Sequence, residues 1–270
     1  MASFSVVTNI AAVNSQANLY HTNVGLKQAL TRVSSGFRIN YSGDDAAGLA
    51  VANQYRSEVA ILTQGVRNAN DGLSDLQIKD GALDNISKLL DRLAVLATQA
   101  ASGQTSTASR TTLNNEFQDV LSEITREANV ANLNVSAATQ GFSVFVSSNG
   151  TDGVVAGDIG DIDTTTLGVE GQDISTQSGA QDAVAQVTAA ITVLGTVQGQ
   201  VGQLQNRLSY AINLAQSQIV NTKAAESRIR DANIAEESAN MTRFNILNQS
   251  GIAALAQANQ STSAVLSLLR

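Results

Sequence analysis

The residues of this chain that could do chemistry are few. His21 is the only histidine, and the chain contains no cysteine. A Ser-His-Asp or Cys-His set needs a histidine base beside a nucleophile, whereas His21 lies in a pattern typical of a terminal helix. We therefore interpret His21 as a surface or interface residue, and we predict that the chain is not an enzyme and uses no cofactor.

Adjacent carboxylates at Asp44 and Asp45 could suggest a metal ligand pair. Neighbouring residues do not share a helix face, and acidic residues suit the positive N-terminal end of a helix. Helix capping explains the pair better, and we expect Ser42 or Asp44 to cap the helix that follows.

A second acidic, glycine-containing run could hold calcium through hard oxygen ligands. Its members are Asp152, Asp158, Asp161 and Asp163. The run lacks the spacing of an EF-hand, which favours roles in turn formation and solubility. We therefore predict no metal site.

Composition excludes several classes of partner. Lys and Arg number 16 against 23 Asp and Glu, a net charge of −7, which argues against nucleic acid. No run approaches the ~20 apolar residues of a membrane span. No N-terminal stretch has a basic region followed by an apolar one, so we expect no signal peptide of the Sec type. These features predict no membrane partner and, by themselves, favour a cytosolic protein.

The elements that must position these residues are long helices. The chain has no proline, so nothing interrupts a helical hydrogen-bond ladder. The first apolar stripe is spaced alternately by four and three residues: Val6, Ile10, Val13, Ala17, Tyr20 and Val24. Heptad spacing of this kind predicts a helix that packs along another helix. Turn-forming residues within 34–43 then predict a break.

The same spacing predicts two inner helices. From residue 46 to about residue 101 the stripe is Val59, Leu62, Val66, Ala69, Leu73, Leu76, Asp80, Leu83, Ser87 and Leu90. In the returning helix it is Val184, Val187, Ile191, Leu194, Gln198, Val201, Gln205, Leu208, Ile212, Ala215 and Ile219. Gln198 and Gln205 are thus expected at a helix–helix seam, where polar residues can fix register.

The middle of the chain is different. Residues 129–179 are rich in Gly, Ser, Thr, Asp and Asn, and two short apolar runs, 142–146 and 154–156, are separated by turn signals. These features predict a small β-hairpin. A shorter helix precedes it, with Leu113, Phe117, Val120, Ile124 and Ala128 on one face. The predicted fold is mainly α, a long antiparallel helical rod or coiled-coil bundle with a small β-hairpin region in the middle.

Extended motifs carry a family resemblance. They are the opening Val7-Thr8-Asn9, the segments 62–74 and 77–83, Gln205-Asn206-Arg207-Leu208 and the run 227–237. Across roughly residues 7–131 and 205–270 the chain resembles bacterial flagellin. The family often has Pro in its closing motif where Thr262 stands here, a departure that leaves the last helix free to run on.

The resemblance implies a subunit that self-assembles head-to-tail into the helical flagellar filament used for motility. It implies an inner core domain from residues 1–33 and 234–270, connecting spokes at 34–45 and 224–233, and a rod domain at 46–180 with its returning helix at 181–223. The family's large outer domains are expected to be absent. The implied location is extracellular, after secretion, which replaces the cytosolic reading.

Partners are also implied by the resemblance. They are other copies of the chain, the flagellar export apparatus, a flagellin chaperone, and the filament cap and hook-junction proteins. The residues expected to bury apolar surface on polymerisation are Ile10, Val13, Val24, Leu30, Phe244, Leu247, Ile252, Leu255, Leu266 and Leu269. We expect the terminal segments to be largely disordered before docking.

The host flagellin-sensing Toll-like receptor is a further implied partner. The positions that match its patch are Arg92, Leu96, Gln99 and Glu116, while Ala94 and Val95 stand where the family has charged residues. The alternative is that Arg92 and Glu116 are subunit contacts or solvated charges.

For the whole chain, the alternatives are a hook-filament junction protein and a soluble signalling coiled coil.

Overall fold

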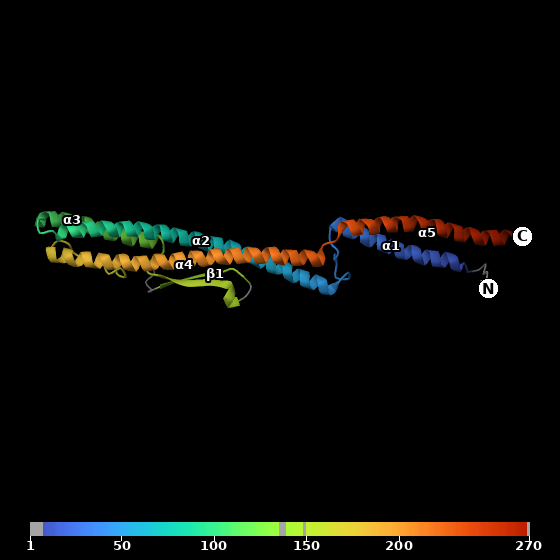
Figure 1. Ribbon diagram of the computed structural model, residues 1–270, viewed down its shortest axis with the longest axis horizontal. Helices are drawn as coiled ribbons and strands as arrows, with labels where there is room; N and C mark the ends of the chain where they lie inside the picture. Colours follow the sequence, from blue (N-terminus) through green and yellow to red (C-terminus); the bar gives the residue numbers. More distant parts are fainter. Residues whose placement is uncertain (1–7, 135–138, 148–149, 269–270) are drawn as a thin grey trace. The chain divides into compact units, whose positions relative to one another are not determined.

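The computed structural model describes residues 8–134, 139–147 and 150–268, with the side chains of residues 151 and 262–268 excepted. Its elements are α1 (Ile10–Ser35), α2 (Ala46–Ala101), α3 (Thr107–Val130), β1 (Thr139–Phe145), the 3-10 turn η1 (Gly150–Gly153), β2 (Val154–Gly160), α4 (Gln177–Arg230) and α5 (Ile234–Leu268) (Figure 1). The mainly helical fold with one small hairpin is confirmed. Among the described residues, no helix has the length and apolar character to span a membrane.

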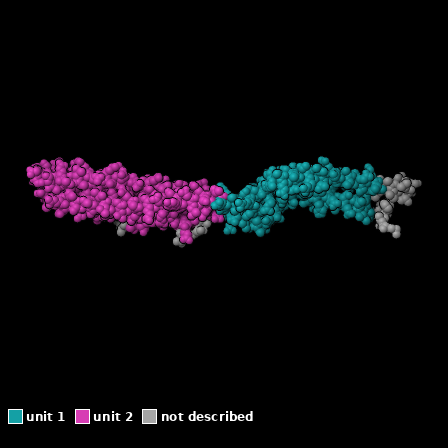
Figure 2. Space-filling view, viewed as in Figure 1, with its two compact units in different colours: residues 1–57, 221–270 teal, residues 58–220 magenta. Residues whose placement is uncertain are grey.

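The chain divides into two compact units. We call residues 1–57 and 221–270 the terminal unit and residues 58–220 the central unit (Figure 2). Of the described apolar residues that are buried, only Ala29, Ile39 and Ala52 belong to the terminal unit. The central unit therefore contains nearly all of the core, and the terminal unit has little of its own.

The core of the central unit is a heptad seam on α2. The seam runs Leu62, Gly65, Ala69, Gly72, Leu76, Lys79, Leu83, Ile86, Leu90, Leu93, Ala97 and Ala100, and all of these residues are buried. The predicted stripe is correct at every second position. At the other positions the fully buried residue lies one place earlier. Asp80 is exposed and Lys79 is buried instead, whereas Val66 and Leu73 are half-buried and still pack against the core. Glycine and lysine carry no apolar signal, so a search for apolar side chains misses them.

The seam of α4 shows the same displacement. Its buried residues are Ala183, Val187, Ala190, Leu194, Val197, Val201, Leu204 and Leu208. The prediction that Gln198 and Gln205 occupy the seam is wrong, since Val197 and Leu204 take those positions. Gln205 lies beside the seam and its Nε2 donates to the carbonyl oxygen of Leu76 at 3.5 Å. The amide thus spans from α4 to α2 without being part of the core.

The hairpin packs on α2 and α4 where these helices carry small residues. β1 and β2 pair antiparallel, with Phe142 opposite Gly157. A Cβ at Gly65 would lie 1.8 Å from the carbonyl oxygen of Val146, so only glycine allows this approach. The Lys79 amine reaches from the seam to Oε1 of Gln140 at 2.7 Å. These contacts fix the hairpin against α2.

α3 and the segment after the hairpin complete the central unit. Phe117, Ile124 and Ala128 are fully buried, which confirms the predicted apolar face of α3. The segment 161–176 returns along that helix: the Ile162 amide donates to Leu133 at 2.8 Å and the Ile174 amide to Oδ1 of Asn114 at 3.0 Å. This loop-like stretch therefore adds side chains to the core.

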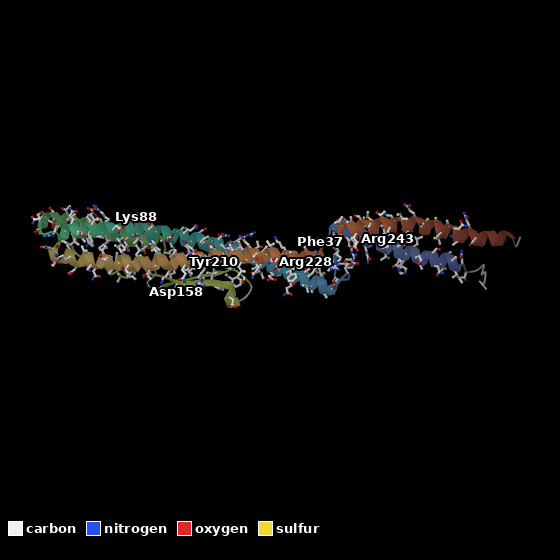
Figure 3. The ribbon with its side chains drawn as sticks, in the orientation of Figure 1. Phe37, Lys88, Asp158, Tyr210, Arg228 and Arg243 are labelled. Carbon is white, nitrogen blue, oxygen red and sulfur yellow. The ribbon has the colours of Figure 1, made fainter. Side chains whose placement is uncertain are left out.

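In the terminal unit the helices end at short connections. α1 ends at Gly36, whose φ of 74° is left-handed and whose amide donates to the Arg32 carbonyl. Phe37, labelled in Figure 3, forms an isolated antiparallel bridge with Asp231. The Arg230 guanidinium lies 4.2 Å above the Phe37 ring, within the range of a cation–π contact.

The break predicted over residues 224–233 is therefore too long. α4 continues without interruption to Arg230, and only residues 231–233 separate it from α5. Its last turn carries Arg228 and Arg230, and basic side chains stabilise a helix C-terminus through the helix dipole.

Candidate interaction surface

The residues considered for chemistry lie apart from one another. His21 is exposed on α1, and its ring meets the ring of Tyr20 edge-on with centroids 5.9 Å apart. Asp163 accepts the Thr166 amide at 2.6 Å and closes a turn, as predicted for a turn-forming acid. Within the part of the chain that the structure describes, no group of three His, Cys, Asp or Glu side chains could hold a metal ion.

The acidic pair before α2 serves the backbone. Asp45 accepts the Gly48 amide at 2.8 Å, the arrangement of an N-cap. Asp44 accepts the Asn40 amide at 3.0 Å and thereby closes the preceding turn. The capping interpretation is confirmed, but the capping residue is Asp45 and not the predicted Ser42 or Asp44.

Replacing Asp45 by alanine is expected to lower the unfolding free energy by about 1 kcal/mol, because one amide of the first turn of α2 loses its acceptor. Asp45→Asn is the matched control, since its amide oxygen keeps the acceptor. Urea unfolding followed by circular dichroism measures both variants. Equal stability of the alanine variant and the unchanged chain would contradict the assignment of the cap.

In the terminal unit α1 and α5 lie side by side (Figure 1). Three polar contacts join them along their length: Arg32 with Glu237 at 3.1 Å, Asn248 with Asn23 at 2.6 Å, and Asn9 with the Ala258 carbonyl at 2.8 Å. Residue numbers rise on one helix as they fall on the other. The pair is therefore antiparallel and in one register from end to end, which confirms that the first and last helices pair.

The α1 face that meets α5 is a heptad seam of mostly small or polar residues. It consists of Ala12, Ser15, Leu19, Thr22, Leu26, Ala29 and Val33. On α5 the matching seam is Glu237, Met241, Phe244, Asn248, Gly251, Leu255 and Ala258. Gly25 admits the Phe244 ring, because a Cβ there would lie 2.6 Å from the ring. Only Ala29 is fully buried on α1, so this pairing leaves most apolar area uncovered.

The apolar stripe found in the sequence of α1 lies on the other side of the helix. We call Ile10, Val13, Ala17, Tyr20 and Val24 the outer stripe. With 3.6 residues per turn these positions are opposite the seam, and all five are exposed, Ile10 by 60% and Tyr20 by 68%. A continuous exposed apolar stripe of this kind marks an interaction surface.

α5 shows exposed apolar side chains on several faces. Ile246 lies opposite the α5 seam, while Leu247 and Ile252 lie on its two flanks, and all three are exposed. After Arg243 no charged side chain follows until Arg270. Exposed apolar side chains on an uncharged helix mark surfaces that contact other molecules. α5 therefore has apolar surface available to other molecules in addition to its contact with α1.

The structure separates the residues expected in polymer packing into two groups. Six are exposed in the single chain: Ile10, Val13, Val24, Leu30, Leu247 and Ile252. Phe244 and Leu255 are half-buried in the seam with α1, so their contacts are within the chain. Leu266 and Leu269 fall outside the residues whose side chains are described. The first group is the candidate surface for contact between molecules.

The expected receptor patch lies on the central unit. Arg92 forms a salt bridge with Glu116, its Nε 2.9 Å from the carboxylate, and both side chains are exposed. Gln99 is also exposed. Leu96 is only 1% exposed and belongs to the hydrophobic core of the central unit. Leu96 therefore cannot form a surface contact, and only three of the four positions remain available to a partner.

Comparison with known families and relatives identifies both halves of this helical arrangement. Residues 6–140 match the bacterial flagellin N-terminal helical region, and residues 184–269 match the bacterial flagellin C-terminal helical region. The flagellin of Halalkalibacterium halodurans is 35% identical over 97% of this chain and 98% of its own length. The flagellin of Bacillus subtilis is 34% identical over the same shares of each chain. A crystal structure of Bacillus cereus flagellin is similar at 27% identity, with a TM-score of 0.48, over 59% of this chain and 94% of that chain.

Proposed function

The chain belongs to the bacterial flagellin family, and we propose that its terminal unit supplies the contacts that hold one subunit to the next. Its function is that of a structural subunit that self-assembles into the extracellular flagellar filament. Neither the hook-filament junction protein nor the signalling coiled coil is favoured. The proposal concerns which residues carry the assembly.

The observation that supports the proposal is the outer stripe. It is a heptad stripe with no partner in the single chain. On the opposite side of α1, α5 has no charged side chain from residue 244 to residue 268. Identical subunits that meet head-to-tail in a contact that does not close form a helical polymer. Such a polymer surrounds each helix pair with copies of the same helices and covers both surfaces.

We propose that α1 and α5 separate and lose order in a single subunit, and that they become ordered on assembly. It has three buried apolar residues among those described, and ordering each residue costs roughly 1–2 kcal/mol in backbone entropy. Burial of a large side chain contributes about 1.5–3 kcal/mol. The pair of helices alone cannot offset its ordering cost, so neighbours must supply the remaining burial.

We further propose the following domain bounds, route of secretion and partners for the chain. The inner core domain comprises residues 1–33 and 234–270, with its spokes at 34–45 and, between α4 and α5, at 231–233. The rod domain comprises residues 46–180 and the returning helix predicted at 181–223, which in α4 continues to Arg230. The large outer domains are absent. The chain is secreted through the flagellar export apparatus with a flagellin chaperone, and it meets the filament cap and hook-junction proteins. The Toll-like receptor contacts Arg92, Gln99 and Glu116, the members of the patch whose side chains are not buried.

Polar substitution of the outer stripe tests the proposed function. The variant Val13→Ser with Tyr20→Ser is expected to raise the critical concentration for filament assembly by at least ~100-fold, because each lost burial is worth about 1.5–3 kcal/mol. Sedimentation of assembled protein measures this concentration. Both side chains are exposed in the single chain, so the melting temperature of the central unit stays unchanged.

The matched control replaces two exposed polar residues of the same helix, Gln16→Ser with Asn18→Ser. It changes α1 by two side chains without removing apolar area from the outer stripe, so its critical concentration stays near that of the unchanged chain. Filaments from the Val13→Ser, Tyr20→Ser chain at the concentration of the unchanged chain would refute the proposed role of this surface.

A further inference from the structure

The outer stripe lies in a part of the chain that is almost free of charge. Residues 1–26 contain no Asp, Glu, Lys or Arg, and neither do residues 244–269. Within these two segments His21 and Tyr20 are the only titratable side chains. A phenol changes charge only near pH 10, whereas an imidazole is the side chain that ordinarily does so between pH 5 and 8. His21 is therefore the one side chain in these two segments that ordinarily changes charge between pH 5 and 8.

His21 lies at the edge of the outer stripe. It is exposed, it follows Ala17 by four residues and precedes Val24 by three, and its ring contacts the Tyr20 ring. Residues at these spacings are neighbours on a helix surface. Any molecule that covers Ala17 and Val24 therefore also covers the imidazole.

The groups around His21 offer it no counter-ion. On α1 the nearest charged side chain is Lys27, and on the partner helix α5 it is Arg243, five residues from the Asn248 that contacts Asn23. Both are cations. The acids of α5, Glu236 and Glu237, lie at the other end of the pair, where Glu237 binds Arg32. A protonated His21 would therefore enter a neutral contact without a carboxylate from its own chain.

We propose that His21 makes filament assembly dependent on pH, with the neutral imidazole admitted to the subunit contact and the protonated form excluded. The inference rests on the proposed function, because it requires that neighbouring copies cover the outer stripe. A buried charge without a partner is costly, and identical subunits bring the same charge near to itself. Neutral His21 is favoured in the filament, so protonation favours the free subunit.

The sign of the effect follows by linkage, since the free subunit binds more protons than the assembled one. Assembly is strongest above the titration range of an imidazole and weakens as the pH falls through it. An imidazole ordinarily gains its proton within the range of pH 5 to 8. The critical concentration is therefore expected to rise several-fold between pH 8.0 and pH 5.5.

The experiment measures the critical concentration of the full chain by sedimentation from pH 8.0 to pH 5.5 at constant ionic strength. The variant His21→Gln, which stays neutral, is expected to lose the rise. The variant His21→Lys is expected to need about the same high concentration at every pH in the range. Circular dichroism at each pH checks that helix content is equal in the three chains.

Two outcomes overturn the inference. One is a rise in the critical concentration of the His21→Gln chain that equals the rise in the unchanged chain. The other is assembly of the His21→Lys chain at the concentration of the unchanged chain at pH 8.0. Failure of the proposed function looks different, since Val13→Ser with Tyr20→Ser would then assemble normally. If that double variant fails to assemble while His21→Gln keeps the pH dependence, only the role of His21 is refuted.

Discussion

A chain that lacks residues 252–270 is expected to form no filaments while its central unit stays folded. The deletion removes six large apolar side chains: Ile252, Leu255, Val265, Leu266, Leu268 and Leu269. Ile252 is exposed and Leu255 lies in the seam with α1, so the deletion weakens contacts within the chain and between chains together. Burial of each large side chain contributes about 1.5–3 kcal/mol. The remaining contacts between subunits cannot offset the loss of this apolar burial.

Electron microscopy and sedimentation at high protein concentration check this prediction. The control is Gln257→Ala in the full-length chain, which changes an exposed polar residue of the same segment and keeps every apolar side chain. It is expected to assemble as the unchanged chain does. Filaments from the truncated chain would show that assembly does not depend on the end of α5.

Replacing Gly65 by leucine is expected to destabilise the central unit by more than about 3 kcal/mol. A Cβ at this position meets the carbonyl oxygen of Val146 at 1.8 Å, and a backbone atom cannot move away without moving its strand. The hairpin must leave α2, and the bond from Asn68 to the Phe145 carbonyl, 3.2 Å long, is then lost. Overpacking in a core typically costs ~1–3 kcal/mol, and displacement of the hairpin adds to it.

Thermal unfolding followed by circular dichroism measures the change. A loss of this size corresponds to a fall of roughly 6–12 °C for a unit of this length. Gly81→Ala is the matched control, because Gly81 lies on the same helix and a Cβ there meets nothing within 4 Å. That control is expected to stabilise α2 by roughly 0.5–1 kcal/mol. A melting temperature for Gly65→Leu equal to that of Gly81→Ala would contradict the close approach of the hairpin.

The sequence predicts the helices and the hairpin because their signals are long and repeated. It does not predict which residues form the seams. Gly65 and Gly72 are buried in the seam of α2 because they are small, and a search for apolar side chains cannot register a residue without one. The buried amine of Lys79 donates to Gln140 and forms a salt bridge with Asp75. The contact with Gln140 depends on the position of a strand 61 residues later.

The apolar stripe of α1 shows a different limit. The seam with α5 consists largely of small or polar residues such as Ser15 and Thr22, so its pattern is weak. The strong pattern, with Val13 and Tyr20, belongs to the exposed side. Periodicity alone indicates that a face is to be covered, without indicating by which chain. The structure resolves this, because α5 lies on the weak face and leaves the strong face free.

The sequence also does not show which residues of the receptor patch are exposed and which are buried. Arg92 and Leu96 are four residues apart on α2, and such residues are neighbours on a helix surface. Arg92 is nevertheless exposed and bound to Glu116, while Leu96 is buried. The edge of the buried face passes between them, and its position depends on how α2 packs.

Hydrogen–deuterium exchange on free subunits and on filaments tests most directly whether the terminal unit is completed by other copies. The amides of α1 and α5 are expected to exchange rapidly in the free subunit and slowly in the filament, while the buried helices of the central unit are protected in both. Equal protection of α1 and α5 in the two states would contradict the account, because the terminal unit would then be stable without neighbours.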